Sequence, residues 1–111
     1  MSTETTRRWF PIWPGVERTT LVSGATMMQM LVNLSEGSRV ADHKHPEEQV
    51  CYLVSGRLRF YVDGVANELA AGDSIYVPSN VVHAVDALEE SVALDTFSPP
   101  REDLLAMDRQ G

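Results

Sequence analysis

The sequence predicts an all-β sandwich or barrel, because short segments that alternate apolar and polar residues recur at roughly even spacing. Turn-forming residues separate these segments. Asp63-Gly64 is the clearest case, since this pair favours the type I′ turn of a β-hairpin. A chain of 111 residues has the size of one domain, so we expect a single domain over residues 1–111.

The N-terminal third predicts two strands that follow an edge segment. Residues 1–8 are polar and are expected to be frayed. The aromatic residues and prolines of residues 9–14 indicate an edge segment that packs either on its own barrel or on a second subunit. Strands are expected at residues 16–23 and 27–34. One face of the second strand forms core or pocket wall through Met28, Met30, Val32 and Leu34.

The rest of the chain predicts further short strands and one short helix. The strands are expected at residues 49–55, 57–62, 65–69, 74–77, 81–87 and 91–97. Pro99-Pro100 ends the last strand, and residues 101–107 are expected to form one or two helical turns.

Composition and charge exclude several classes of function. The formal net charge of -7 argues against nucleic acid or an anionic membrane as the partner, but allows a small anionic substrate. No signal-peptide pattern is present, and no segment approaches the ~20 apolar residues that span a bilayer. The single cysteine, Cys51, excludes an internal disulfide and fits a reducing compartment. We therefore expect a cytoplasmic protein.

His43 and His45 are two of the three histidines, and their spacing places both imidazoles on one face of an extended strand. A turn is expected at residues 46–48, after which Gln49 opens the next strand. Two imidazoles and an amide oxygen suit one side of a metal site. The alternative is that both histidines lie on the surface near a turn.

Residues 37–56 and 72–87 resemble the two motifs of the cupin superfamily. The first motif is carried by Gly37, His43, His45, Gln49 and Gly56, and the second by Gly72, Pro78 and His83. All three histidines fall on ligand positions. The sequence departs from the pattern at Gln49 (usually Glu), Asn80 (often Gly) and Ala87 (usually Asn). The resemblance implies a jelly-roll barrel, also called a double-stranded β-helix.

The same resemblance implies a metal site with the ligands His43, His45, Gln49 and His83. One divalent ion is expected, among nickel, zinc, manganese, iron and cobalt. Because glutamine is neutral where glutamate would be charged, the bound ion keeps more Lewis acidity and attracts anions more strongly. Alternatively, Gln49 only makes hydrogen bonds near the site.

Asp95 and Phe97 share one face of the last predicted strand, and Arg101 follows in the first helical turn. A buried carboxylate is costly unless it is paired, and a cation in the first turn opposes the helix dipole. One interpretation is an Asp95–Arg101 ion pair that closes the barrel. The other is that both residues are functional.

The run LDTFSPPREDLL, together with the histidine set, resembles the small KdgF-type cupins of pectin and alginate breakdown, over about residues 16–105. This resemblance implies a non-redox enzyme that converts 4,5-unsaturated monouronates to linear keto-deoxyuronates. The matching catalytic residues are Asp95, Phe97 and Arg101, and the substrate is a small anionic sugar.

Three alternatives remain open: an iron-dependent dioxygenase, a non-catalytic module that binds a sugar or acid, and a metal-bearing storage or structural barrel. Substrate turnover separates the first from the others. Small cupins are commonly dimers, so we also expect a homodimer that uses residues 9–13.

Overall fold

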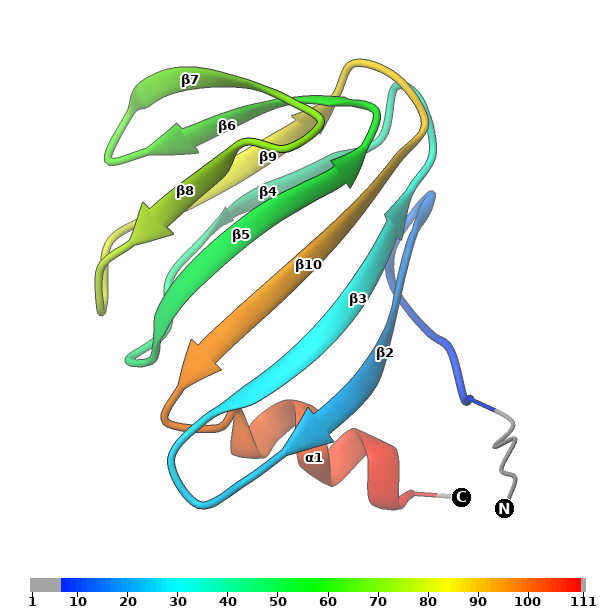
Figure 1. The fold of residues 1–111 in the computed structure, drawn as a ribbon, viewed down its shortest axis with the longest axis vertical. Coiled ribbons are helices and arrows are strands. Elements are labelled where there is room, and N and C mark those ends of the chain that lie inside the picture. The colour runs from blue at the N-terminus through cyan, green and yellow to red at the C-terminus, as the bar shows by residue number, and fades with distance from the viewer. Residues whose placement is uncertain (1–6, 111) are drawn as a thin grey trace.

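The computed structural model describes residues 7–110, and their strands form two sheets (Figure 1). In chain order the elements are β1 (Phe10–Trp13), β2 (Val16–Ser23), β3 (Met28–Leu34), β4 (Arg39–His43), β5 (Glu48–Ser55), β6 (Arg57–Val62), β7 (Val65–Ala70), β8 (Ser74–Val77), β9 (His83–Ala87), β10 (Ser91–Ser98) and α1 (Glu102–Arg109). One sheet has the order β1-β2-β3-β10-β5-β8 and the other β4-β9-β6-β7, with antiparallel neighbours throughout.

The predicted fold class, a jelly-roll barrel with a short C-terminal helix, is confirmed. The β2, β6 and β8 strands have the predicted bounds, and β3, β5, β7, β9 and β10 differ from the predicted bounds by one or two residues. No bounds were predicted for β1 and β4. Asp63 and Gly64 have φ values of 52° and 79°, as a type I′ turn between β6 and β7 requires. The fraying predicted for residues 1–8 concerns mostly residues 1–6, which lie outside the described residues.

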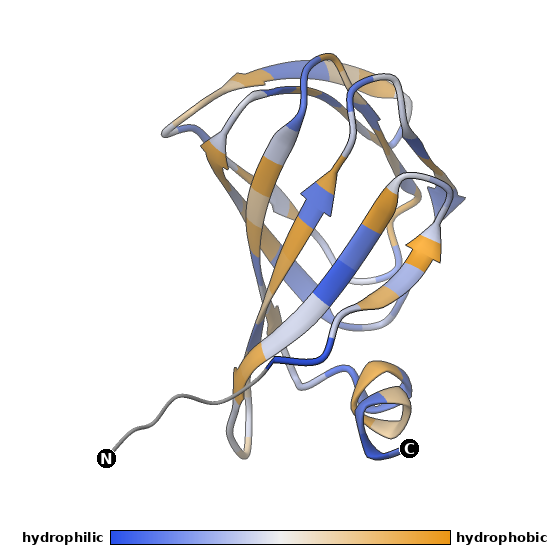
Figure 2. Ribbon diagram, turned by 90° about the vertical axis from the view of Figure 1, so that its right-hand side faces the viewer, coloured by the Kyte–Doolittle hydropathy of each residue, from blue (hydrophilic) through white to orange (hydrophobic). Residues whose placement is uncertain are grey.

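The core lies between the two sheets, because alternate residues of each strand point inward. Hydrophobic and hydrophilic residues alternate along the strands in Figure 2. The predicted apolar face of β3 is buried at all four positions, none more than 5% exposed. On β10 the same alternation turns Asp95 and Phe97 inward, to 7% and 1% exposure. The strand period alone therefore places a carboxyl group in the interior.

The N-terminal aromatic segment forms β1, at the edge of the six-stranded sheet. It pairs with β2 of the same chain, and Ile12 packs against the core. Within the single chain this segment packs on its own barrel, and its contact with a second subunit in a homodimer stays a prediction. Among residues 7–110, no helix is long and apolar enough to cross a membrane.

Two tight turns hold the strands that carry the candidate site. Gly56, between β5 and β6, has a φ of +95°, and a Cβ there would lie 2.2 Å from the Ser91 hydroxyl oxygen. Only glycine fits this turn. Asn80 has a φ of 61°, a conformation that asparagine tolerates better than most residues. Its backbone N–H donates to the carbonyl of His45 at 2.8 Å, which ties the turn before β9 to the segment after β4.

Helix α1 is anchored to the barrel by a polar group that we call the Arg18 cluster, made of Arg18, Thr20 and Asp108. Arg18 is fully buried. Its Nη2 atom donates to the carbonyl of Leu104 at 2.9 Å and lies 3.0 Å from Oδ1 of Asp108. Thr20 donates its hydroxyl to the same carboxylate. Sequence reasoning missed this cluster, although the alternation from Val16 to Thr20 turns Arg18 inward.

Candidate metal centre

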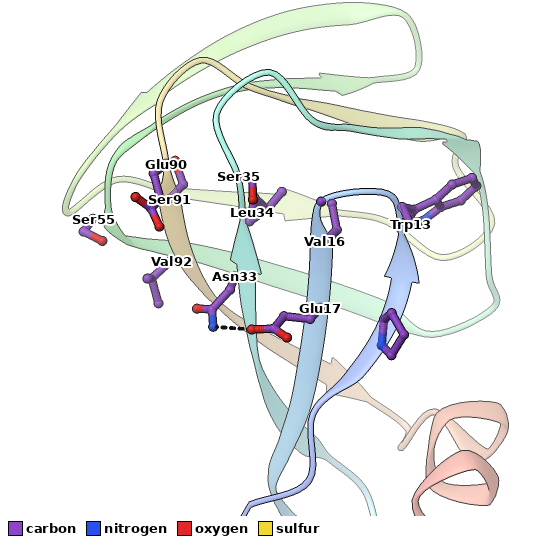
Figure 3. A pocket seen from close by; sticks show the side chains of 12 residues that line it. Trp13, Val16, Glu17, Asn33, Leu34, Ser35, Ser55, Glu90, Ser91 and Val92 are labelled. Carbon is purple, nitrogen blue, oxygen red and sulfur yellow. Dashed lines mark hydrogen bonds between the residues drawn. The ribbon is translucent and has the colours of Figure 1, made fainter.

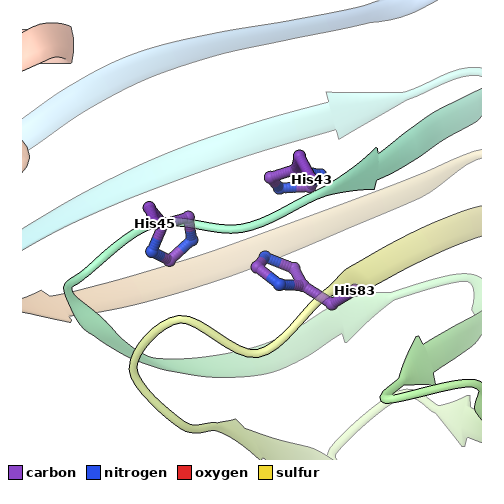
Figure 4. Close-up of side chains that lie close together, drawn as sticks. All are labelled: His43, His45 and His83. Atoms are coloured by element: carbon purple, nitrogen blue, oxygen red, sulfur yellow. The ribbon is translucent and has the colours of Figure 1, made fainter.

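The three histidines meet in one group, which we call the histidine cluster (Figure 4). His43 is the last residue of β4, His83 is the first of β9, and the two are paired across the strands. His45 was expected in the same extended strand, but β4 ends at His43 and His45 lies in the segment that follows. The predicted turn is also shorter, because Glu48 already belongs to β5. The hydrogen bond from Asn80, rather than a strand ladder, holds this segment.

The imidazoles of the histidine cluster all present the same ring atom to one another. Each Nδ1 lies within hydrogen-bond distance of a backbone carbonyl: His43 with Ala41 at 2.8 Å, His45 with Glu47 at 3.0 Å, and His83 with Val81 at 2.8 Å. Since a carbonyl only accepts, each Nδ1 carries the proton, and each neutral ring keeps a lone pair on Nε2. One ring nitrogen from each histidine lies within 4.8 Å of the others.

Burial disfavours the protonated form of two of these rings. Burial lowers the pKa of His83 to about 4, and burial together with the Arg101 charge lowers the pKa of His45 below its ordinary value. The Nε2 atom of His83 is buried and has no hydrogen-bond partner among residues 7–110. Three Lewis bases that face one another without a donor form a group able to hold a metal ion. The chain's donors therefore fit the expected divalent ion.

Gln49 lies beside the histidine cluster and bridges it to Asp95. Its amide nitrogen donates to Oδ1 of Asp95 at 3.0 Å, which turns the amide oxygen toward Nε2 of His45 at 3.2 Å. The amide oxygen of Gln49 and Nε2 of His45 are both acceptors when Nδ1 of His45 carries the proton. A cation near the two acceptors would remove this unfavourable contact. The role of Gln49 as a fourth ligand stays a prediction.

Asp95 is a buried carboxyl group, and no cation of residues 7–110 lies at ion-pair distance from it. Burial raises the pKa of Asp95 to about 6, against the opposing effect of hydrogen bonds from Gln49 and Cys51. The thiol of Cys51 is itself buried, and burial together with the nearby Asp95 raises its pKa well above the ordinary value. The carboxyl group is therefore held by neutral donors.

The Asp95–Arg101 ion pair considered from sequence is not formed between these two described residues. Arg101 instead donates from Nε and Nη2 to the two carboxylate oxygens of Asp103, at 3.1 and 2.9 Å. Its guanidinium carbon lies 5.0 Å from the centroid of the Phe97 ring. Arg101 is the N-cap of α1, where a cation is unfavourable to the helix dipole, and the carboxylate of Asp103 in the first turn offsets that charge.

Most of the candidate site residues line one cavity of about 230 Å³, whereas His45 and Asp103 lie outside its lining. The polar side chains that line it include His43, His83, Gln49, Asp95 and Arg101, and its other walls are mostly apolar. Sequence reasoning missed Glu47, whose carboxylate lies between His45 and Arg101. Nothing in the sequence distinguishes it from Glu48, because the bend that turns it inward depends on the tertiary fold.

A second, wider hollow of about 670 Å³ lies toward the other end of the strands (Figure 3). Its lining includes the carboxylates of Glu17 and Glu90 and the ring of Trp13, and no arginine or lysine is among the described residues that line it. Without a cation it is poorly suited to an anionic ligand. The smaller cavity, with Arg101 and the histidine cluster, is the candidate functional site.

A jelly roll whose strands bring three histidines to one point defines the class of protein, and the family comparison agrees. Residues 30–97 match the cupin domain family, so the chain belongs to the cupin family.

Within that family the resemblance to KdgF-type cupins is confirmed. The chain is 32% identical to the pectin degradation protein KdgF of Dickeya dadantii over 99 residues, which cover 87% of this chain and 90% of the relative. The structure of KdgF from a Halomonas species matches with a TM-score of 0.83 at 29% identity, over 87% and 90% of the two chains. An RmlC-like cupin from Shewanella frigidimarina matches with a TM-score of 0.85 at 34% identity, over 93% of each chain.

Proposed function

We propose that this protein is a metal-dependent enzyme of pectin or alginate breakdown that converts 4,5-unsaturated monouronates to linear keto-deoxyuronates. The likeness to KdgF, a pectin degradation protein, supports the pathway. The observation that carries the reaction type is Asp95, a buried carboxyl group whose pKa burial raises to about 6 and which forms no ion pair with any described residue. A carboxyl group of this kind can give and take a proton near neutral pH.

The proposed substrate is a cyclic enol ether that bears one carboxylate, and Arg101 is the cation that binds it. The guanidinium lines the cavity and lies over the Phe97 ring. A planar guanidinium can bind a carboxylate through two parallel N–H bonds. Because Nε and Nη2 already donate to Asp103, the substrate carboxylate would use the edge formed by Nη1 and Nη2. Arg101 would thereby orient the ring above the histidine cluster.

The chemistry that follows is an addition of water and a ring opening, without oxidation or reduction. Asp95 delivers its proton to one carbon of the double bond, and a water oxygen bonds to the neighbouring carbon. The proton lost by that water restores Asp95. The resulting hemiketal then breaks the bond between its carbon and the ring oxygen, which leaves a ketone and a hydroxyl group on an open chain.

A divalent ion held by the histidines and Gln49 would act as a Lewis acid toward a substrate oxygen or water. Gln49 also donates to Asp95, so one side chain connects the proposed ligand set to the proposed acid. Phe97, at 1% exposure, closes the cavity wall between Arg101 and His45. The apolar walls limit bulk water and so protect the raised pKa of Asp95.

The test is incubation of metal-loaded protein with unsaturated galacturonate, following the absorbance of the conjugated double bond. We expect accelerated loss of absorbance that stops when the metal is removed. Arg101→Lys should raise KM, because an ammonium cannot reproduce the two-pronged contact. Arg57→Lys, an exposed arginine outside the cavity, is the matched control and should leave KM unchanged. No acceleration by the metal-loaded wild-type protein would refute the proposed reaction.

A further inference from the structure

Glu47 lies in the bend between β4 and β5, and its carboxylate is enclosed at the edge of the candidate site. Its side chain is 12% exposed, and its Oε1 atom is buried without a hydrogen-bond partner in the part of the chain that the structure describes. That oxygen lies 3.6 Å from Nε of Arg101 and 3.5 Å from Nδ1 of His45. Because a buried carboxylate oxygen without a donor is unfavourable, this placement does little for the stability of the barrel.

The charge of Glu47 has two neighbours, His45 and Arg101, and they have different proposed roles. Its backbone carbonyl accepts the Nδ1–H of His45, and its side chain faces the guanidinium of Arg101. A negative charge beside the imidazole favours a cation on the far ring nitrogen. The same charge beside Arg101 reduces the pull of that residue on anions. One carboxylate therefore acts on the metal and on the substrate in opposite directions.

Two carboxylates of the chain lie near the Arg101 guanidinium, and water screens them unequally. Glu47 is 12% exposed and Asp103 is 63% exposed, so water weakens the charge of Asp103 more than that of Glu47. A ligand with one carboxylate can bind Arg101, whereas a second carboxylate on the same ligand would meet the enclosed negative charge of Glu47.

We propose that Glu47 sets the charge of the site and thereby selects ligands with one carboxylate over ligands with two. The inference rests on the proposed function in taking a singly charged sugar acid as the ligand. Removing the charge of Glu47 leaves an additional positive charge for an incoming anion. The same change weakens the hold on the metal. A side chain that only supports the fold would not produce these opposite effects.

The experiment compares wild-type protein with the isosteric variant Glu47→Gln. The probes are galacturonate, which has one carboxylate, and galactarate, which has two, and neither contains the reactive double bond. Calorimetry on zinc-loaded protein gives both dissociation constants, and a competition titration gives the zinc affinity. We expect the preference for galacturonate over galactarate to fall about tenfold and the zinc affinity to fall several-fold, as one charge at this range implies.

Glu48→Gln is the matched control, because it removes the same charge one residue away. Glu48 is exposed, and its carboxylate accepts a hydrogen bond from the Tyr76 hydroxyl at 2.7 Å, outside the cavity. The net charge of the two variants is identical. All three affinities of Glu48→Gln should therefore stay within about twofold of wild type, since water screens an exposed charge.

Equal behaviour of the two variants would overturn the assignment of Glu47. A parallel loss of zinc and of both acids in Glu47→Gln would overturn it as well, because that pattern means a structural role. The proposed function fails separately, through the absence of turnover of unsaturated galacturonate by wild-type protein. Turnover without a charge effect refutes only the role of Glu47, and a charge effect without turnover refutes only the reaction.

Discussion

The barrel contains two buried polar groups, the Arg18 cluster and the histidine cluster, and they differ in whether the chain itself supplies an opposite charge. The Arg18 cluster joins a cation to a carboxylate, a carbonyl and a hydroxyl group, so opposite charges meet inside the chain. The histidine cluster joins three imidazoles, and each offers one ring nitrogen to a common point. In a structural group the chain itself supplies the opposite charge, whereas a binding group is completed by a bound ion.

The two aspartates of these regions show the same contrast. Asp108 is paired with Arg18 at 3.0 Å. Asp95 is more deeply buried but is held by the neutral donors of Gln49 and Cys51. Removing a charge should therefore cost stability at the first site and activity at the second. Each prediction below tests one side of that contrast.

Breaking the Arg18 cluster should give the largest loss of stability. Arg18→Met removes the buried cation and strands Asp108, which we expect to lower the free energy of unfolding by about 3 kcal/mol. Arg57→Met is the control, because Arg57 is 46% exposed in a surface pair with Glu68 and should cost less than about 1 kcal/mol. Chemical denaturation measures both variants. Equal losses in the two would mean that the Arg18 cluster contributes no more than a surface ion pair.

Asp95→Asn should leave the fold intact and slow the reaction. The amide cannot relay a proton, so we expect the rate to fall by about 10²-fold or more. The melting temperature and metal content should stay close to wild type, because no cation at ion-pair distance loses its partner. Kinetics on unsaturated galacturonate measure the rate, and the melting temperature and metal content of the same variant are the controls. A stable, metal-loaded variant with full activity would remove Asp95 from the mechanism.

Gln49→Glu should have a smaller effect on the rate while keeping the metal. A carboxylate at this position would tighten metal binding and weaken both Lewis acidity and anion attraction. It would also stand next to Oδ1 of Asp95, which the amide nitrogen now contacts at 3.0 Å. We expect turnover to fall several-fold at unchanged metal content. If the kinetics do not change, Gln49 is not a ligand or the metal has only a structural role.

The strands and the histidine cluster could be predicted because they depend on local patterns. Period-two alternation predicted the buried face of β3, and the Asp63-Gly64 pair predicted a hairpin. The cupin spacing predicted that His83 lies near His43. Contacts between distant segments could not be predicted this way. Spacing alone suggested Asp95 as the partner of Arg101, but stacking on Phe97 and the start of α1 turn the guanidinium to Asp103.

The Arg18 cluster and Glu47 show two kinds of missed residue. Arg18 carried a usable signal, since it occupies an inward position of β2 between buried neighbours. Its partner Asp108 did not, because the helix packing that brings it near depends on the whole barrel. Glu47 carried no signal, as its burial follows from a bend held by contacts between the segments on either side.

Metal content tests the contrast between the two groups most directly. Elemental analysis of dialysed protein, after loading with a divalent metal, should give one ion per chain for wild type. The double variant His43→Ala, His83→Ala should retain none, because water cannot replace two imidazole donors without a large loss of affinity. Arg18→Met, if folded, should retain a full equivalent. Undiminished metal in the double variant, or none in wild type, would contradict the account.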